Sequence, residues 1–275
     1  MAKEAITMNN YLKFWGFKSE PFPTDLPAEH IFKSRNLAAF DQRFEYVLRL
    51  GAVGLVTGEI GAGKSTALRY AVDKLHPSQF KPFYVTAASG SVLEFYRLIL
   101  SEMGFEVQSI SRAAMRGLIK RESLDLALAK NIKPVLIVDE ASLMRLEAFA
   151  EIHTIIQFEK DSKPYLPLIL AGQSNLIDKL TFRDSQPLAS RVAARSHFEG
   201  ADLEEMTVYL KHHLTAAGLK DDPFEPEAAA AIQQGSGGVF RKANHLARGA
   251  LMAAAEQKVK SITADHVRLA ATEIF

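Results

Sequence analysis

A glycine-rich stretch at residues 58–65 lies between an apolar run and a helical pattern. It reads Gly-Glu-Ile-Gly-Ala-Gly-Lys-Ser and fits the phosphate-loop pattern G-x-x-x-x-G-K-[ST]. Residues 53–56 before it predict a buried strand, and residues 66–72 after it predict the start of a helix. A phosphate site needs this order, because glycines let backbone N–H groups turn toward an anion and a helix N-terminus adds positive potential. The alternative is a surface turn that carries Lys-Ser by chance.

The loop predicts ATP and Mg²⁺ as cofactors. Lys64 would reach the β- and γ-phosphates, and the hydroxyl of Ser65 would ligate Mg²⁺. The residues expected to surround the phosphates are Gly58, Glu59, Ile60, Gly61, Ala62, Gly63, Lys64, Ser65 and Thr66.

Composition limits the remaining possibilities. The chain has 275 residues, enough for one large or two smaller domains, and its hydrophobic fraction of 48% is that of a protein with a real core. The formal net charge of +1 means that any nucleic-acid site must be a local basic patch. The chain has no cysteine, which excludes disulfides, thiolate metal sites and a cysteine nucleophile. No apolar stretch approaches the roughly 18 residues of a membrane span and no signal peptide is evident, so a cytoplasmic protein without membrane contact is expected.

A second motif stands at residues 134–140, where an apolar run ends in two carboxylates, Asp139 and Glu140. Four β-forming residues predict a strand buried on both faces, and open α/β sheets bind their ligands at the carboxyl ends of such strands. This is the Walker B pattern. Asp139 would hold Mg²⁺ and Glu140 would polarise the attacking water. A strand that ends in Asp-Glu by chance is the alternative, although its distance after the phosphate loop in an alternating β/α chain argues against chance.

Three further polar residues are candidates for the same chemistry. Residues 166–172 predict another buried strand, and Gln173 at its end could bind the γ-phosphate if that strand lies between the two motif strands. Arg191 and Arg195 stand four residues apart near the end of the α/β region. One of them could reach a neighbouring subunit's γ-phosphate as an arginine finger, with Arg191 preferred. An ordinary strand end and ordinary surface arginines are the alternatives.

A predicted helix at residues 111–130 carries a basic stripe. Arg112, Arg116 and Lys120 recur at four-residue spacing, with Arg121 beside them. Three like charges on one helix face repel unless an anion neutralises them, so the stripe is a candidate contact to the phosphate backbone of DNA. A charged face that is simply solvated is the alternative.

The ends of the chain differ in character from its middle. Residues 1–50 contain an aromatic-rich segment around Tyr11 and Trp15, followed by a helical pattern, and are expected to dock on the core, with an aromatic ring flanking adenine as a further possibility. Residues 51–200 alternate strands and helices and predict an α/β nucleotide-binding domain. Residues 201–275 predict four helices and no strand, a small helical domain in which the histidines show no metal spacing.

With these motifs in place, the chain resembles AAA+ ATPases of the ExeA type, a group that also resembles transposon ATPases of the TnsC, TniB and Mu B kind. The resemblance covers nearly the whole chain and includes Trp15-Gly16-Phe17, the phosphate loop, Val138-Asp139-Glu140-Ala141, Leu170-Ala171-Gly172-Gln173 and residues 237–244. It implies a P-loop AAA+ three-layer sandwich with a parallel sheet, followed by a small all-helical lid domain. It also implies that Arg241, in the sensor 2 segment, touches the γ-phosphate.

The resemblance implies that ATP sits at subunit boundaries of a ring or helical filament, with Arg191 supplied by a neighbour. Secretion-type ExeA proteins continue beyond the ATPase into a membrane segment and a wall-binding part, whereas this chain ends at Phe275, which favours the transposition helpers. The expected function is an ATPase that assembles on double-stranded DNA and regulates or targets a transposase, with hydrolysis driving disassembly. A secretion- or assembly-type ATPase that acts on protein partners is the second hypothesis, and a nucleotide-gated scaffold without turnover is the third.

Overall fold

A computed structural model describes residues 10–106 and 111–274. The chain divides into two compact units. The sheet unit contains Arg35–Glu59 and Lys64–Phe198, and the helical unit contains Met1–Ser34, Ile60–Gly63 and Glu199–Phe275. The central part of the phosphate loop therefore belongs to the helical unit, whereas its two ends belong to the sheet unit.

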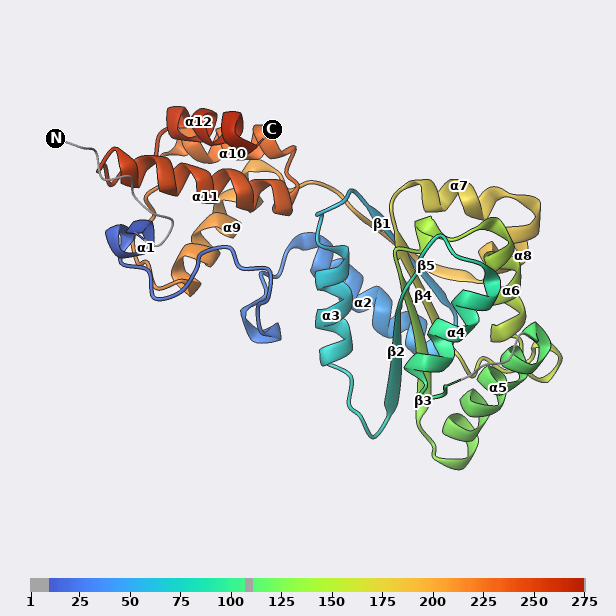
Figure 1. Cartoon of the computed structure of the whole chain (residues 1–275). Helices are drawn as coiled ribbons and strands as arrows, with labels where there is room; N and C mark the ends of the chain where they lie inside the picture. The colour runs from blue at the N-terminus through green and yellow to red at the C-terminus, as the bar shows by residue number, and fades with distance from the viewer. Residues whose placement is uncertain (1–9, 107–110, 275) are drawn as a thin grey trace. The chain divides into compact units, whose positions relative to one another are not determined.

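In the described part of the chain, the sheet unit contains one parallel sheet of five strands in the order β2-β3-β4-β1-β5 (Figure 1). This order confirms the predicted α/β fold. The sequence predicts three of these strands from their apolar runs and a fourth over residues 81–86, whereas β5 is not expected. The strands are β1 (Val53–Gly58), β2 (Phe80–Thr86), β3 (Lys133–Asp139), β4 (Leu168–Gly172) and β5 (Val192–Phe198).

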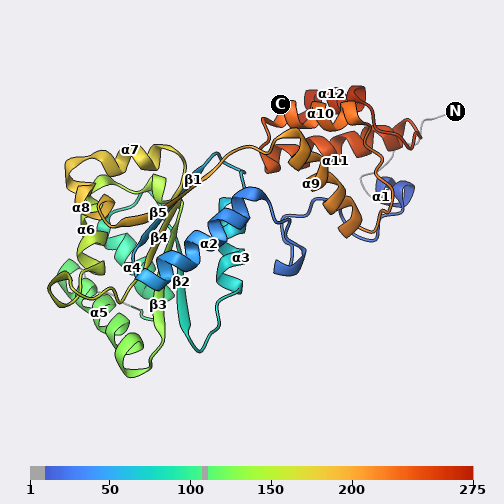
Figure 2. The same cartoon turned by 180° about the vertical axis from the view of Figure 1, so that it is seen from behind.

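Helices cover both faces of this sheet (Figures 1 and 2). Val53 and Leu55 of β1 point into a core shared with α4, α5 and α6, whereas Gly54 and Val56 face α2 on the other side. A Cβ at Gly54 would lie 2.8 Å from Ile169 Cδ1 and 3.2 Å from Val47 Cγ2, so α2 packs closely here because this position is glycine. The helices of this unit are α2 (Arg35–Leu50), α3 (Lys64–Asp73), α4 (Val92–Glu102), α5 (Arg112–Leu124), α6 (Leu146–Ile156), α7 (Asn175–Thr181) and α8 (Gln186–Ala189).

Local sequence signals explain where two of these helices begin. The Ser91 hydroxyl accepts from the Glu94 backbone N–H at 3.3 Å, and the Glu94 carboxylate accepts from the Ser91 N–H at 2.5 Å, which together form a capping box. The Ser111 hydroxyl caps α5 by accepting from the Ala114 N–H. The helix predicted over residues 111–130 continues past Leu124 as a π-helical turn at Asp125–Ala129.

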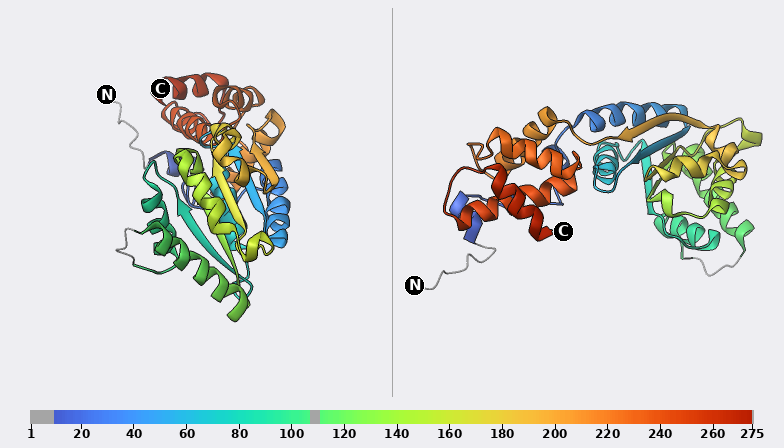
Figure 3. Two further views of the ribbon diagram at one scale, coloured as in Figure 1. Left: turned by 90° about the vertical axis from the view of Figure 1, so that its right-hand side faces the viewer. Right: turned by 90° about the horizontal axis from the view of Figure 1, so that it is seen from above.

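The helical unit contains α1 (Asn10–Trp15), α9 (Leu203–Ala216), α10 (Pro226–Ser236), α11 (Phe240–Glu256) and α12 (Ala264–Ile274). The Trp15 indole N–H donates to the Leu251 carbonyl of α11 at 2.9 Å, and α1 lies against α11 (Figure 3). Tyr11, Trp15 and Phe22 are buried in one apolar cluster with residues of α9, α10 and α11. The sequence predicts that the aromatic segment docks on the core. In the structure, the described residues up to Ser34 belong to the helical unit, and the rings pack into its apolar cluster.

Within residues 10–106 and 111–274, no helix has both the length and the hydropathy that are needed to cross a membrane.

Candidate functional site

The sheet unit brings the polar ends of three adjacent strands together. Strand β4 lies between β1 and β3. Because the strands are parallel, their carboxyl ends share one edge of the sheet, which is where α/β sheets bind ligands. Gly58 at the end of β1, Asp139 at the end of β3 and Gln173 directly after β4 lie along this edge. The strand order therefore satisfies the condition on which the prediction for Gln173 depends.

Lys64 is buried at the first turn of α3, with 6% of its surface exposed. Its ammonium group donates to the carbonyls of Gly58 at 2.9 Å and Glu59 at 2.8 Å. A buried ammonium must have acceptors, and these carbonyls supply them at the foot of the loop. The charge is thereby held beside the N-terminus of α3, where Ser65 and Thr66 also lie and where an anion is favoured.

Gly58 is needed for a close approach between strands. A Cβ at this position would lie 2.6 Å from the carbonyl oxygen of Phe198 on β5, and the φ of Gly58 is +155°. At the same level, the Thr57 hydroxyl and His197 Nδ1 are 2.9 Å apart. The end of β1 is thus fixed laterally by β5 before the chain enters the loop.

In the helical unit, the loop residues Ile60, Gly61, Ala62 and Gly63 lie beside the start of α11. The backbone N–H of Arg241 donates to the Gly61 carbonyl at 3.2 Å. A Cβ at Gly61 would lie 2.6 Å from Arg241 Cβ, and Gly61 has a φ of +88°, so only glycine fits here. Arg241 is exposed, and its neighbour Phe240 packs against Tyr209 with ring centroids 4.3 Å apart. The packing of Phe240 fixes the first turn of α11, so Arg241 is held next to the central residues of the phosphate loop.

The two carboxylates of the second motif differ in environment. Asp139 is buried, with 5% exposure, and its Oδ1 accepts from the Glu140 N–H at 2.8 Å. Glu140 is half-buried and adopts left-handed backbone angles of φ +53° and ψ +30°. Such a conformation is uncommon for a residue other than glycine and recurs at functional sites. It turns the chain at the end of β3, immediately after Asp139.

Sequence reasoning missed one residue of this site, Tyr84 on β2. Its hydroxyl donates to Asp139 Oδ2 at 2.6 Å and lies close to the side chain of Ser65. Burial, followed by the hydrogen bond to Asp139, raises the pKa of Tyr84 well above its usual range. A tyrosine within an apolar strand carries no sequence signal for this role, because its partner Asp139 is 55 residues away.

The residues present fit a magnesium ion bound together with nucleotide phosphates. The Ser65 hydroxyl and the Asp139 carboxylate are hard oxygen donors, and both lie close to the Tyr84 hydroxyl. Among the described residues, no group of three or more His, Cys, Asp or Glu side chains could hold a metal ion by itself. Mg²⁺ normally uses one or two protein oxygens plus substrate phosphates, so this sparse donor set is the expected one.

Arg191 lies at the opposite edge of the sheet. Its carbonyl accepts from the Val53 N–H at the start of β1, 3.1 Å away. The guanidinium donates to the Pro187 carbonyl at 2.6 Å and forms an ion pair with Asp161. Arg195 is exposed on β5 and pairs with Leu55 in the middle of β1. Neither arginine is at the edge that carries Gly58 and Asp139.

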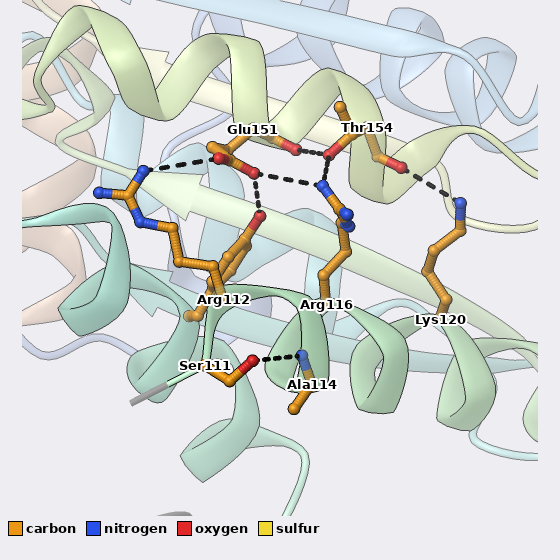
Figure 4. A network of polar contacts seen from close by, with 8 residues as sticks. Ser111, Arg112, Ala114, Arg116, Lys120, Glu151 and Thr154 are labelled. Atoms are coloured by element: carbon orange, nitrogen blue, oxygen red, sulfur yellow. Dashed lines mark hydrogen bonds and ion pairs between the residues drawn. The ribbon is translucent and has the colours of Figure 1, made fainter. Parts of the chain in front are cut away.

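The basic stripe of α5 lies against α6 and is therefore only partly exposed to solvent (Figure 4). Arg112 and Arg116 each approach the Glu151 carboxylate of α6 to 3.7 Å, and Lys120 donates to the Thr154 carbonyl at 3.2 Å. Glu151 also accepts from the Tyr96 hydroxyl at 2.5 Å. The anion that the sequence argument requires is therefore present within the same unit. Arg112 remains half exposed, and Arg121 is exposed.

Comparison with protein families finds a match in the middle of the chain. Residues 49–180 match the model of an AAA domain. The chain is 27% identical over 267 residues to general secretion pathway protein A of Aeromonas hydrophila. The alignment covers 96% of this chain and 48% of that protein, so the chain spans about half the length of this curated relative.

Solved structures share the fold. The ORC2 protein of Aeropyrum pernix, in its ADPNP–ADP complexes, is 20% identical with a TM-score of 0.68, covering 94% of this chain and 72% of that one. The structure of Drosophila ORC bound to DNA is 18% identical with a TM-score of 0.63, covering 93% of this chain and 70% of that one. These similarities confirm the predicted AAA+ fold and support the predicted ATP hydrolase, while the transposon branch of the resemblance stays a prediction. The chain has the AAA+ P-loop fold, its residues 49–180 match the model of an AAA domain, and it is similar to general secretion pathway protein A.

Proposed function

We propose that the chain is an ATP-driven assembly switch that binds duplex DNA. In this proposal, ATP with Mg²⁺ binds at the boundary between two copies, the copies form a ring or filament on DNA, and hydrolysis weakens the assembly. A transposase or another recombination protein is the client suggested by the sequence resemblance.

The sheet-edge residues and the loop carry the proposed hydrolysis. Residues 58–66 would hold the phosphates, with Lys64 moving from the Gly58 and Glu59 carbonyls to the β- and γ-phosphates. Ser65 and Asp139 would hold Mg²⁺, which when bound neutralises charge that develops on the phosphate oxygens. Glu140 would polarise the attacking water, while Gln173 and Arg241 would contact the γ-phosphate. Asp139, Glu140 and Gln173 lie at the ends of strands, so these three groups need little rearrangement to act.

The position of Arg191 is the observation that carries the proposal of a shared site. Arg191 lies beside Val53, and the phosphate loop begins at Gly58, five residues further along β1. At about 3.3 Å per residue, that separation is roughly 16 Å, more than an arginine side chain can span. Arg191 can therefore not serve the nucleotide of its own subunit. It stands at the surface opposite the loop, where it could serve the nucleotide of a neighbour.

The proposed DNA contact is the basic stripe, formed by Arg112, Arg116, Lys120 and Arg121. Arg112 and Arg116 share one carboxylate, Glu151, at ion-pair distances of 3.7 Å, and both are partly exposed. Exposed pairs of this kind are weak, typically below about 1 kcal/mol. A DNA phosphate could therefore replace Glu151 at little cost, and several such contacts together would give appreciable, salt-dependent affinity. The DNA in the Drosophila ORC structure supports this choice by analogy of fold.

A second candidate is an ATPase that acts on protein partners without DNA. The observation in its favour is the similarity to general secretion pathway protein A, which extends over 96% of this chain. The two candidates share the nucleotide site and differ only in what the assembly binds.

DNA binding at defined salt separates the two candidates. Fluorescence anisotropy of a labelled duplex of arbitrary sequence should show binding with a non-hydrolysable ATP analogue and weaker binding with ADP. Replacing Arg112, Arg116 and Lys120 by alanine should weaken binding and make its log–log salt dependence shallower by about one unit for each basic side chain that no longer neutralises a phosphate. Glu151→Gln should have the opposite effect, since it frees Arg112 and Arg116 from their internal anion.

Lys130→Ala is the matched control, because Lys130 also carries a positive charge and lies in an ion pair with Asp125 at 2.8 Å, outside the stripe. It should change DNA affinity much less than the stripe variants. Absence of binding at low salt with the analogue would exclude the DNA proposal and leave the protein-directed ATPase. Binding that is unaffected by the stripe variants would move the DNA contact to another surface.

A further inference from the structure

Tyr84 connects the two residues that are assigned to magnesium. Its hydroxyl donates to Asp139 Oδ2 at 2.6 Å and lies close to the Ser65 side chain. These partners come from different elements, since Ser65 is in the first turn of α3 and Asp139 ends β3. One phenol group therefore joins the loop motif to the strand motif.

The Asp139 carboxylate is oriented by donors on both of its oxygens. Oδ2 accepts from Tyr84 and Oδ1 accepts from the Glu140 N–H at 2.8 Å. Asp139 is 5% exposed, so water is largely excluded from it. A buried carboxylate without donors would be costly, and one with two donors is held in a single orientation.

The position of Tyr84 is itself fixed by the strand that carries it. Its neighbours Phe83 and Val85 are each 3% exposed and pack into the core under α4. Side chains alternate along a strand, so the Tyr84 ring is directed to the other face, on which α3 lies. Tyr84 pairs with Ile137 of β3, two positions before Asp139.

We propose that Tyr84 is a positioning residue for magnesium, whose hydroxyl holds Asp139 and Ser65 in place for the metal–nucleotide complex. Its role rests on the proposed metal role of Ser65 and Asp139. Tyr84 acts through these two residues. Outer partners of metal ligands commonly change metal affinity by about 10- to 100-fold when removed.

The test is the Mg²⁺ dependence of nucleotide binding, measured with a fluorescent non-hydrolysable ATP analogue. Tyr84→Phe should raise the half-saturating Mg²⁺ concentration by about 10-fold. Binding of the analogue in EDTA should stay unchanged, because the loop backbone and Lys64 hold the phosphates. Tyr96→Phe is the matched control, since Tyr96 also donates to a carboxylate, Glu151 at 2.5 Å, and should keep the wild-type Mg²⁺ dependence.

Two further variants distinguish a failure of this proposal from a failure of the assignment of Ser65 and Asp139 to magnesium, on which it rests. Ser65→Ala and Asp139→Asn should each raise the half-saturating Mg²⁺ concentration, and Tyr84→Phe should add little in the Asp139→Asn background, because coupled residues are not additive. If Ser65→Ala and Asp139→Asn have no effect, the metal assignment is wrong. If they have an effect and Tyr84→Phe has none, the role of Tyr84 alone is overturned. Tyr84→Leu, with no hydroxyl, gives the same comparison if circular dichroism shows that Tyr84→Phe is unfolded.

Discussion

Glu140 combines an uncommon backbone conformation with the position expected of a catalytic base. Its left-handed angles follow directly after a strand that is buried on both faces. The N–H of the same residue donates to Asp139 Oδ1, so the turn is stabilised by the neighbouring carboxylate. The side chain of Glu140 leaves the line of β3 while Asp139 stays buried. Two adjacent carboxylates thereby acquire different surroundings, which suits one to metal binding and the other to a proton-accepting role.

Glu140→Gln is expected to abolish most hydrolysis without abolishing nucleotide binding. A positioned general base typically contributes about 10²- to 10⁴-fold, so kcat should fall by at least about 100-fold. Phosphate release and fluorescent-nucleotide affinity should be measured on the same preparation. Glu147→Gln, an exposed position on α6, is the control. A Glu140→Gln variant that hydrolyses ATP at the wild-type rate would remove Glu140 from the mechanism.

At the scale of elements, the N-terminal segment is held to α9 by stacked rings. Phe22 is fully buried and stacks on His213 with centroids 5.2 Å apart and an interplanar angle of 27°. Tyr209 meets the same histidine edge-on at 4.4 Å. Within the described residues, His213 Nδ1 has no hydrogen-bond partner. His213 is therefore a packed core residue, more constrained than the ordinary helix residue that the sequence predicts.

This packing should make stability depend on pH. Burial, followed by the nearby charge of His212, lowers the pKa of His213 to about 4, whereas an unfolded histidine titrates near 6.5. Between these values the unfolded chain binds the proton and the folded chain does not, so the free energy of unfolding should fall as the pH drops from about 6.5 to 4. The loss is on the order of 3 kcal/mol at the lower end. Urea unfolding at several pH values should show it.

His213→Leu should flatten this part of the pH profile whatever it does to absolute stability. His245→Leu is the control, because His245 is exposed on α11. If the slope of the His213→Leu variant matches that of the wild type, His213 is not the group responsible.

At the scale of the whole molecule, catalysis in the proposed assembly depends on two copies. Arg191 lies at the edge of the sheet opposite the phosphate loop. Within its own subunit it hydrogen-bonds Pro187 and forms an ion pair with Asp161. Assembly would have to exchange these partners for a phosphate. An arginine finger is worth about 10³- to 10⁵-fold in rate, which is ample to make hydrolysis conditional on a neighbour.

Mixing variants tests this dependence directly. Arg191→Ala alone should lose at least about 10³-fold in kcat, and Glu140→Gln alone is also expected to be nearly inactive. Mixed together, the two should regain activity, because an Arg191→Ala subunit keeps its own Glu140 and receives Arg191 from a Glu140→Gln neighbour. The comparison is a mixture in which Arg195→Ala takes the place of Arg191→Ala. If the mixture stays inactive while both variants still assemble, Arg191 does not act in trans.

Most of the fold is predictable because its signals are local. Four strands contain β-forming residues in short runs, and the helix after β2 begins at a capping box, so their existence is encoded within a few residues. Strand β5 is not predicted because Ala, Arg and Ser are weak β-formers. Among the described residues, it pairs with β1 on one side only. Likewise, short α7 has no strong periodicity. These elements form because neighbouring chain segments offer them hydrogen bonds and apolar surface.

The sequence alone determined the chemistry of the nucleotide site, because the phosphate loop and the Asp139–Glu140 pair each place their groups within a few consecutive residues. Only the tertiary structure decided how these motifs are combined. Strand order put Gln173 between them, and the β2–β3 pairing brought Tyr84 to Asp139. It also paired Arg112 and Arg116 with Glu151 of α6. Such interactions join residues that are tens of positions apart, and no local pattern specifies which strands and helices become neighbours.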